Sequence, residues 1–149
     1  MQQRERSDAV QTPSQGQMGQ RSFVLVLATD EEVVNVLQSF AEQHAIGAAQ
    51  MTAIGAFRDA ELSYLRIPVQ EQVEVAAFIG DVAVAPSGDP VLHIHVVVGR
   101  RDGTAMAGHL QATYVRPTLE VILTESPVYL RKTKDPNSGL ALIDSNASQ

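Results

Sequence analysis

The chain has 149 residues, 44% of them hydrophobic and 19% charged, and this composition is typical of one folded domain with its own core. It contains no cysteine, which excludes disulfide bonds, zinc–thiolate sites and cysteine nucleophiles. The net charge is −6, and residues 21–130, with six basic and 13 acidic side chains, carry −7. Proteins that bind nucleic acid unaided are usually basic, because phosphate contacts supply most of the affinity. We therefore expect any DNA binding to be weak or indirect.

The two ends of the chain differ from its middle. Residues 1–20 are rich in Gln, Ser, Gly and Arg and are predicted to form a disordered tail. Residues 21–131 are predicted to form the folded domain, and residues 132–149 a flexible tail with a short strand at 140–143. The chain begins without the apolar stretch of a signal peptide, and no apolar run is long enough to span a membrane. We expect a cytoplasmic protein with no membrane partner.

A strand followed by a helix is predicted at the start of the domain. Ser22–Ala28 is an apolar run of strand length. Thr29 and Glu32 form the pattern of a capping box, which predicts one main helix over about residues 30–44. Its apolar stripe at helical spacing consists of Val33, Val34, Leu37, Phe40 and Ala41.

The rest of the domain has the pattern of strands and turns. Strands are predicted at 48–57, 62–67, 73–84, 92–99, 104–115, 118–123 and 128–130. The pattern indicates an α+β fold with a central antiparallel or mixed sheet of about seven strands and one main helix. One helix cannot cover a sheet of this size. The remainder is expected to be covered by a partner subunit, or by closure of the sheet into a barrel.

Three of the four histidines are close together in sequence, at His93, His95 and His109. Alternate residues of a strand point to the same face, so His93 and His95 should lie side by side, about 7 Å apart along the strand. Histidine is the commonest metal ligand, and two imidazoles at this spacing can lean toward one ion. The same pair also suits a polar cluster that satisfies itself without a metal.

The loop between the two histidine strands decides whether His109 joins the pair. A two-residue loop, Asp102-Gly103, would pair His95 with Leu110 and turn His109 to the opposite face. A three-residue loop that includes Arg101 would place His95 directly across from His109. Gly103 suits the left-handed third position of such a loop. Both registers fit the sequence.

Two acidic residues could complete a metal site. Glu74 and Glu120 lie in otherwise apolar strands, and each could be a fourth ligand or accept an imidazole N–H, or could simply face solvent. Three histidines with one open position form the ligand set of a catalytic zinc, so the expected cofactor is a divalent metal, zinc before iron or nickel. His44, at the predicted helix end, is expected to be structural. The chain has no nucleophile elbow and no phosphate-binding glycine loop.

The same motifs resemble those of the PPC family (plants and prokaryotes conserved). Leu92-His93-Ile94-His95 with Gly99, then Gly108-His109-Leu110, then Thr118-Leu119-Glu120-Val121 are similar to the family's L-H-x-H-x-x-x-G, G-G-H-L and T-x-E-V. The resemblance covers roughly residues 21–130. It implies an α+β fold with a central antiparallel sheet, assembly as a homotrimer and a DNA-associated or transcription-associated role. No R-G-R-P core of an AT-hook accompanies it here.

The leading hypothesis is therefore a homotrimeric regulatory or interaction module that associates with protein partners or with DNA, in preference to an enzyme. The alternative is a metal-dependent enzyme or small-molecule binder that uses His93, His95 and His109 at a subunit boundary. A third hypothesis is a structural trimer in which these histidines only satisfy one another and the nearby backbone.

Overall fold

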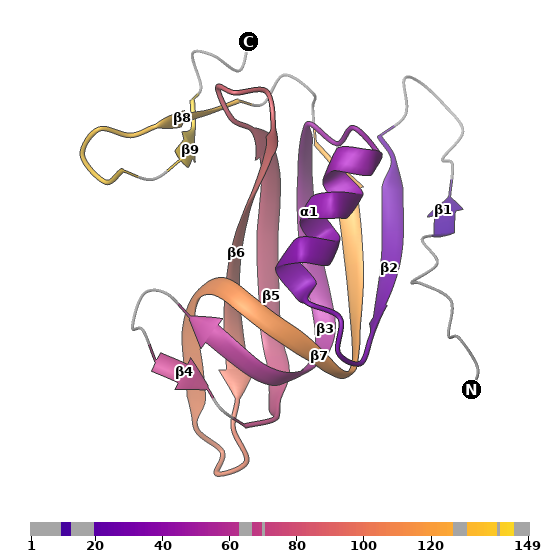
Figure 1. The fold of residues 1–149 in the computed structure, drawn as a ribbon, viewed down its shortest axis with the longest axis vertical. Helices are drawn as coiled ribbons and strands as arrows, with labels where there is room; N and C mark the ends of the chain where they lie inside the picture. The colour runs from indigo at the N-terminus through magenta and orange to yellow at the C-terminus, as the bar shows by residue number, and fades with distance from the viewer. Residues whose placement is uncertain are drawn as a thin grey trace.

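The computed structural model describes residues 10–12, 20–62, 67–69, 71–126, 131–139 and 141–144. These residues form strands for the most part, together with one α-helix (Figure 1). The elements are β1 (Val10–Thr12), β2 (Ser22–Ala28), α1 (Val33–Gln43), β3 (Ala48–Leu62), β4 (Ile67–Val69), β5 (Val73–Val84), β6 (Pro90–Gly99), β7 (Ala105–Glu125), β8 (Lys132–Lys134) and β9 (Ala141–Ile143).

The main sheet has the strand order β1-β2-β7-β6-β5-β3-β4 and is antiparallel throughout. A further pairing of β7 with β3 closes β7, β6, β5 and β3 into a barrel-like ring. The expected α+β class overstated the helical content, since the described residues include one short helix. Closure lets the sheet cover much of its own inner face, and helices are not needed for that part. Seven strands make up this sheet, but β1 and β4 have only three residues each, and β8 and β9 form a separate pair.

Two strands are longer than the sequence indicated. The strand predicted at 48–57 continues to Leu62 as β3, because Asp59 and Ala60 also pair with β7 and Ala60 is buried. The break predicted between the strands at 104–115 and 118–123 is also wrong, because β7 continues through Pro117. Proline has no backbone N–H and cannot donate a hydrogen bond to a neighbouring strand. Pro117 lies where the β7–β3 register shifts, between Val115 and Leu119, so no ladder bond is required of it.

The helix begins three residues later than predicted. Asp30 has a φ of 70°, which turns the chain before the helix can start. The hydroxyl of Thr29 donates to the carbonyl oxygen of Pro117 instead of capping the helix. Glu32 is the N-cap, and its carboxylate accepts from the N–H of Asn35 at 2.7 Å and from the N–H of Thr113 at 3.1 Å. The predicted span of 30–44 is therefore corrected to Val33–Gln43.

The inner face of the sheet holds the hydrophobic core, and α1 packs across it (Figure 1). The helix buries one stripe at helical spacing. The buried helical residues are Val33, Leu37, Phe40 and Ala41. Side chains alternate between the two faces of a strand, and every second side chain of β2, β6 and β7 points outward.

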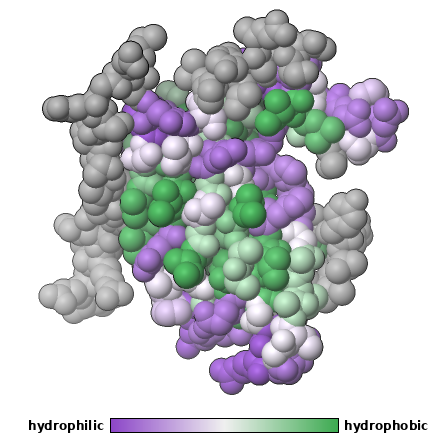
Figure 2. All heavy atoms as spheres, turned by 180° about the vertical axis from the view of Figure 1, so that it is seen from behind, coloured by the Kyte–Doolittle hydropathy of each residue, from purple (hydrophilic) through white to green (hydrophobic). Residues whose placement is uncertain are grey.

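The face turned away from α1 exposes large aliphatic side chains, as Figure 2 shows. We call it the outer apolar face, and it consists of Val24, Val26, Ile54, Ile79 and Ile122, which are 42–67% exposed. Cross-strand pairing joins part of this face to the histidines in one continuous row. The row runs through Val24, Ile122, Thr52, Ile79, His95 and His109.

Some expectations fall outside the described residues. Of the predicted tail at 1–20, only residues 10–12 and 20 are described, and the predicted strand at 128–130 is not. Within the range 140–143, where a short strand is predicted, the described residues Ala141–Ile143 form β9, which pairs with β8. No helix in the described part of the chain is long and apolar enough to cross a membrane.

Candidate metal centre

The pair His93 and His95 is placed by the alternation of β6. Ile94 and Val96 point into the core, each with 2% of its surface exposed. The histidines between them therefore point outward, His93 half-buried and His95 exposed. The prediction that the two share one face is confirmed.

The hairpin between β6 and β7 brings the third histidine to the same place. The N–H of Arg100 donates to the carbonyl oxygen of Thr104 at 2.8 Å, and Gly103 takes a φ of 84°. This is the three-residue loop, and it pairs His95 directly with His109. The alternative two-residue register is wrong, because Gly103 occupies the left-handed third position.

The three imidazoles form a compact cluster. The Nε2 atoms of His93 and His95 are 3.0 Å apart, and one ligand atom from each of the three rings lies within 4.8 Å of the others. Ring centroids of the three pairs are separated by 4.7, 4.8 and 5.6 Å. Tetrahedral zinc with Zn–N bonds of about 2.0–2.1 Å needs ligand nitrogens about 3.3 Å apart. Small ring rotations would meet that spacing, so the residues fit a three-histidine metal ion with an open position.

The surroundings keep two of the rings neutral at pH 7. Burial lowers the pKa of His93 below its ordinary value of 6.5, and the charge of Lys132 lowers it further, while Asp81 opposes both. Burial also lowers the pKa of His109, with smaller contributions from His93, His95 and Lys132. Neutral imidazole is the form that binds metal.

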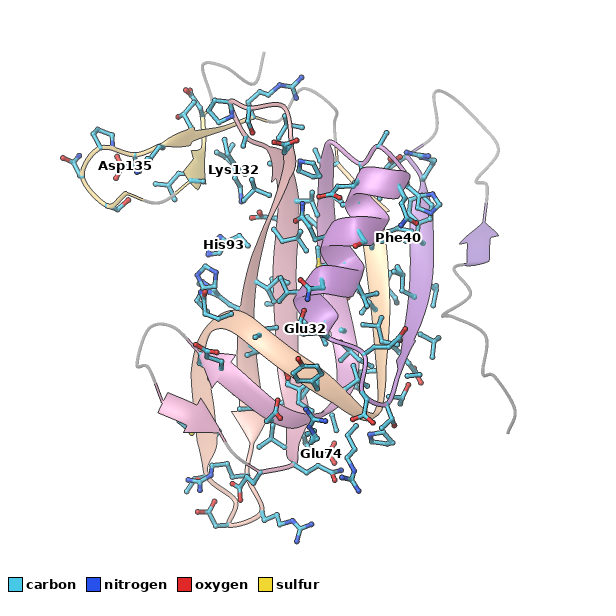
Figure 3. The ribbon with its side chains drawn as sticks, in the orientation of Figure 1. Glu32, Phe40, Glu74, His93, Lys132 and Asp135 are labelled. Carbon is cyan, nitrogen blue, oxygen red and sulfur yellow. The ribbon has the colours of Figure 1, made fainter. Side chains whose placement is uncertain are left out.

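A lysine and an aspartate beside the histidines were missed by the sequence reasoning. Asp81 pairs across β5 and β6 with His93. The ammonium of Lys132 donates to the Asp81 carboxylate, and the Lys132 side chain is only 2% exposed. Lys132 belongs to the predicted C-terminal tail, yet its side chain is buried beside the cluster, and Figure 3 shows it near His93.

Asp81 could have been found from the sequence, whereas Lys132 could not. The turn after β5 pairs Val84 with Pro90, and counting back from it places Asp81 across from His93. Lys132 reaches the cluster only because β8 folds back against the barrel, where Arg131 bridges to Val84. No local pattern indicates that contact.

The two acidic residues expected near the histidines lie elsewhere in the protomer. Glu74 pairs with Gly99, four residues from His95 and about 13 Å along the strand, and Figure 3 shows it far from His93. Glu120 pairs with Val26 and Ile54, so β3 and β5 separate it from the histidine strand β6. Both are exposed, and neither reaches the cluster within one chain.

His44 has the structural position expected of it. It is the C-cap of α1, and its ring lies 4.2 Å from that of Phe40, between centroids.

Hollows lined by described residues adjoin the histidine cluster on several sides. One of about 440 Å³ borders His95 and His109 and is mostly apolar. A second, of about 370 Å³, includes His93, His95 and Asp81 in its wall. A third, of about 100 Å³, lies between His93, His109 and Lys132. The cluster is thus accessible to small ligands from more than one side.

Solved structures share this fold over most of their length. A candidate DNA-binding protein of Bacteroides thetaiotaomicron has a TM-score of 0.81 at 22% identity, covering 95% of this chain and 99% of its own. A metal-containing protein of Archaeoglobus fulgidus has a TM-score of 0.71 at 28% identity, with coverage of 83% and 93%. A plant- and prokaryote-conserved (PPC) protein of Pyrococcus horikoshii has a TM-score of 0.75 at 24% identity, with coverage of 89% and 98%.

The family comparison agrees with the fold. No curated protein matches the chain. The family model of the Plants and Prokaryotes Conserved domain, abbreviated PCC or PPC, matches residues 14–127, and these include all three clustered histidines. The chain therefore belongs to the Plants and Prokaryotes Conserved domain family.

Proposed function

We propose that this protein is a homotrimeric interaction module that holds one divalent metal ion, zinc by preference, on His93, His95 and His109 of each subunit. The observation that carries the proposal is the convergence of three imidazoles, with one ligand atom from each within 4.8 Å of the others. When bound, the ion would act as a Lewis acid with one open coordination position. The chain's own part is to hold three neutral ligands on rigid, paired strands.

Two further observations favour a metal over a self-satisfied histidine cluster. Burial lowers the pKa of His93 and His109, so both rings are unprotonated and available as ligands at pH 7. The Archaeoglobus relative, at 28% identity, is described as metal-containing.

The outer apolar face supports self-assembly. Five large aliphatic side chains, each 42–67% exposed, lie on neighbouring strands of one face. A cyclic assembly buries such a face on every subunit at once. The cross-strand row that includes Ile79 leads directly to His95, so a subunit boundary on this face would lie beside the metal centre.

A DNA-associated role is supported by similarity and opposed by charge. Two of the structural relatives, one from Bacteroides and one from Ralstonia, are candidate DNA-binding proteins. Residues 21–130 carry −7, however, and phosphate binding needs positive charge. We propose that the module acts on DNA only weakly, or through protein partners.

Metal analysis of protein purified without a histidine tag tests the metal site. We expect one zinc per chain, lost in His95→Ala and retained in His44→Ala, which removes an imidazole outside the cluster. Metal-free protein that does not take up added zinc at pH 7.5 would refute the proposal. Light scattering of the same samples tests assembly, with a trimer expected and a stable monomer at micromolar concentration as the contrary result.

A further inference from the structure

Lys132 is a buried cation in the wall of a small cavity beside the histidines. Its side chain is 2% exposed, and the cavity of about 100 Å³ is lined by Val91, Leu92, His93, His109, Lys132 and Ala141. Burying an ammonium group is costly unless an opposite charge compensates it. Asp81 supplies that charge through a direct ion pair.

The C-terminal hairpin places this lysine. Lys132 is the first residue of β8 and lies beyond residue 127, where the match to the family ends. Pairing of β8 with β9 brings Ala141 into the wall of the same cavity. The cavity is therefore built partly from the barrel and partly from a segment that the family match does not include.

The charges at the site favour an anion once a metal is bound. Lys132 and Asp81 cancel one another, and the neutral rings of His93 and His109 add no charge. A divalent ion then brings the net charge of the site to +2, with an open coordination position. An ammonium has three N–H donors, and among the described residues the acceptor found for them is Asp81. The metal and the lysine are thus two cationic groups at one cavity.

We propose that Lys132 is an anion-binding residue of the metal centre, and that the site takes a short-chain monocarboxylate. One carboxylate oxygen occupies the open position on the metal, and the other accepts a hydrogen bond from the Lys132 ammonium. This inference rests on the proposed metal site. A volume of about 100 Å³ is that of roughly three water molecules, which suits a ligand of the size of acetate. The apolar side chains of Val91, Leu92 and Ala141 provide a wall for its methyl group and favour it over inorganic phosphate.

Cobalt-loaded full-length protein provides the test, because Co²⁺ accepts the same imidazole ligands and its visible spectrum reports on the fourth ligand. Acetate should change the spectrum saturably, and neutral acetamide should not. The double variant Asp81→Asn/Lys132→Met removes the ion pair without leaving an unpaired buried charge. It should keep Co²⁺ and bind acetate at least tenfold more weakly, since a charge-assisted hydrogen bond is lost. Lys132→Arg keeps the charge and should retain at least part of the acetate affinity.

A second variant keeps the test decisive if the double variant does not fold. Ala141→Leu fills the cavity and leaves Lys132 and Asp81 in place, so it should bind Co²⁺ but lose acetate. Leu142→Phe, at an exposed position of the same strand, is its control and should bind both.

The outcomes separate the two proposals. Co²⁺ binding with no response to acetate overturns this inference alone, as does an acetate affinity equal to that of the wild type in the folded Asp81→Asn/Lys132→Met or Ala141→Leu variant. Phosphate binding more tightly than acetate overturns the assignment to carboxylates. Folded wild-type protein that does not bind Co²⁺ overturns both the inference and the proposed function.

Discussion

Replacing Ile122 by aspartate should dissociate the proposed trimer without unfolding the subunit. Ile122 lies on the outer apolar face, with 53% of its surface exposed, between Val24 on β2 and Thr52 on β3. A folded monomer already leaves half of this side chain in water, so Ile122→Asp should change the stability of the monomer only slightly. In an assembly that covers the face, the new carboxylate would be buried beside Val24 and Thr52, with Glu120 two residues away on the same face and no cation among the described residues that pair with it across the strands.

The size of the effect follows from burial. Fully burying an isoleucine is worth about 1.5–3 kcal/mol, so covering its exposed half contributes about 1 kcal/mol at each site. An unpaired carboxylate at a covered position adds at least ~2 kcal/mol of desolvation. The total of ~3 kcal/mol corresponds to roughly 100-fold weaker association for each site, and a cyclic trimer repeats the site three times.

Light scattering over a concentration series, with thermal unfolding of the same samples, measures both quantities. Leu142→Asp is the matched control, because Leu142 is 43% exposed but lies on β9, outside the outer apolar face. We expect monomer for Ile122→Asp and trimer for the control. An Ile122→Asp protein that remains trimeric at low micromolar concentration would show that this face is not the interface.

The remaining predictions concern pH, backbone space and DNA. His93 and His109 have pKa values below 6.5 in the folded chain, so between the folded and unfolded pKa values the unfolded chain binds more protons. The free energy of unfolding of metal-free protein should fall as pH drops below about 6.5, as urea titrations at pH 7.5 and 5.5 can measure. The double variant His93→Gln/His109→Gln should lose that dependence, and an unchanged slope would contradict the assignment. Gly55→Ala should reduce the free energy of unfolding, measured by thermal melting, by several kcal/mol, because the new Cβ would lie 2.2 Å from the carbonyl oxygen of Thr118. Gly88→Ala should reduce it by only ~1 kcal/mol, because Gly88 has a φ of 94° but open space around its Cα. Anisotropy with labelled duplex DNA should show weak binding at 50 mM salt that disappears by 200 mM, and nanomolar affinity at the higher salt would refute this.

The sequence by itself was enough to place two of the three clustered histidines. Alternation along β6 is a local property with a period of two, so the shared face of His93 and His95 follows from the apolar residues between them. The third required only a choice between two loop lengths, and Gly103 suits the loop that the structure contains. The family followed from the same motifs, because their combination is more specific than any one of them.

Tertiary structure alone decided that Lys132 lies beside the cluster and that the two expected acidic residues do not. Glu74 and Glu120 lie in the expected strands, but Glu74 pairs with Gly99, about 13 Å along the strand from His95, and β3 and β5 separate Glu120 from β6. Closure of the barrel through β3 and β7 depends on pairings between residues up to 76 positions apart, such as Ala49 with Glu125. Lys132 is the clearest case. Its local sequence, Arg-Lys-Thr-Lys, is that of a solvated segment, and it is buried only because a distant strand provides Asp81 as its counter-charge.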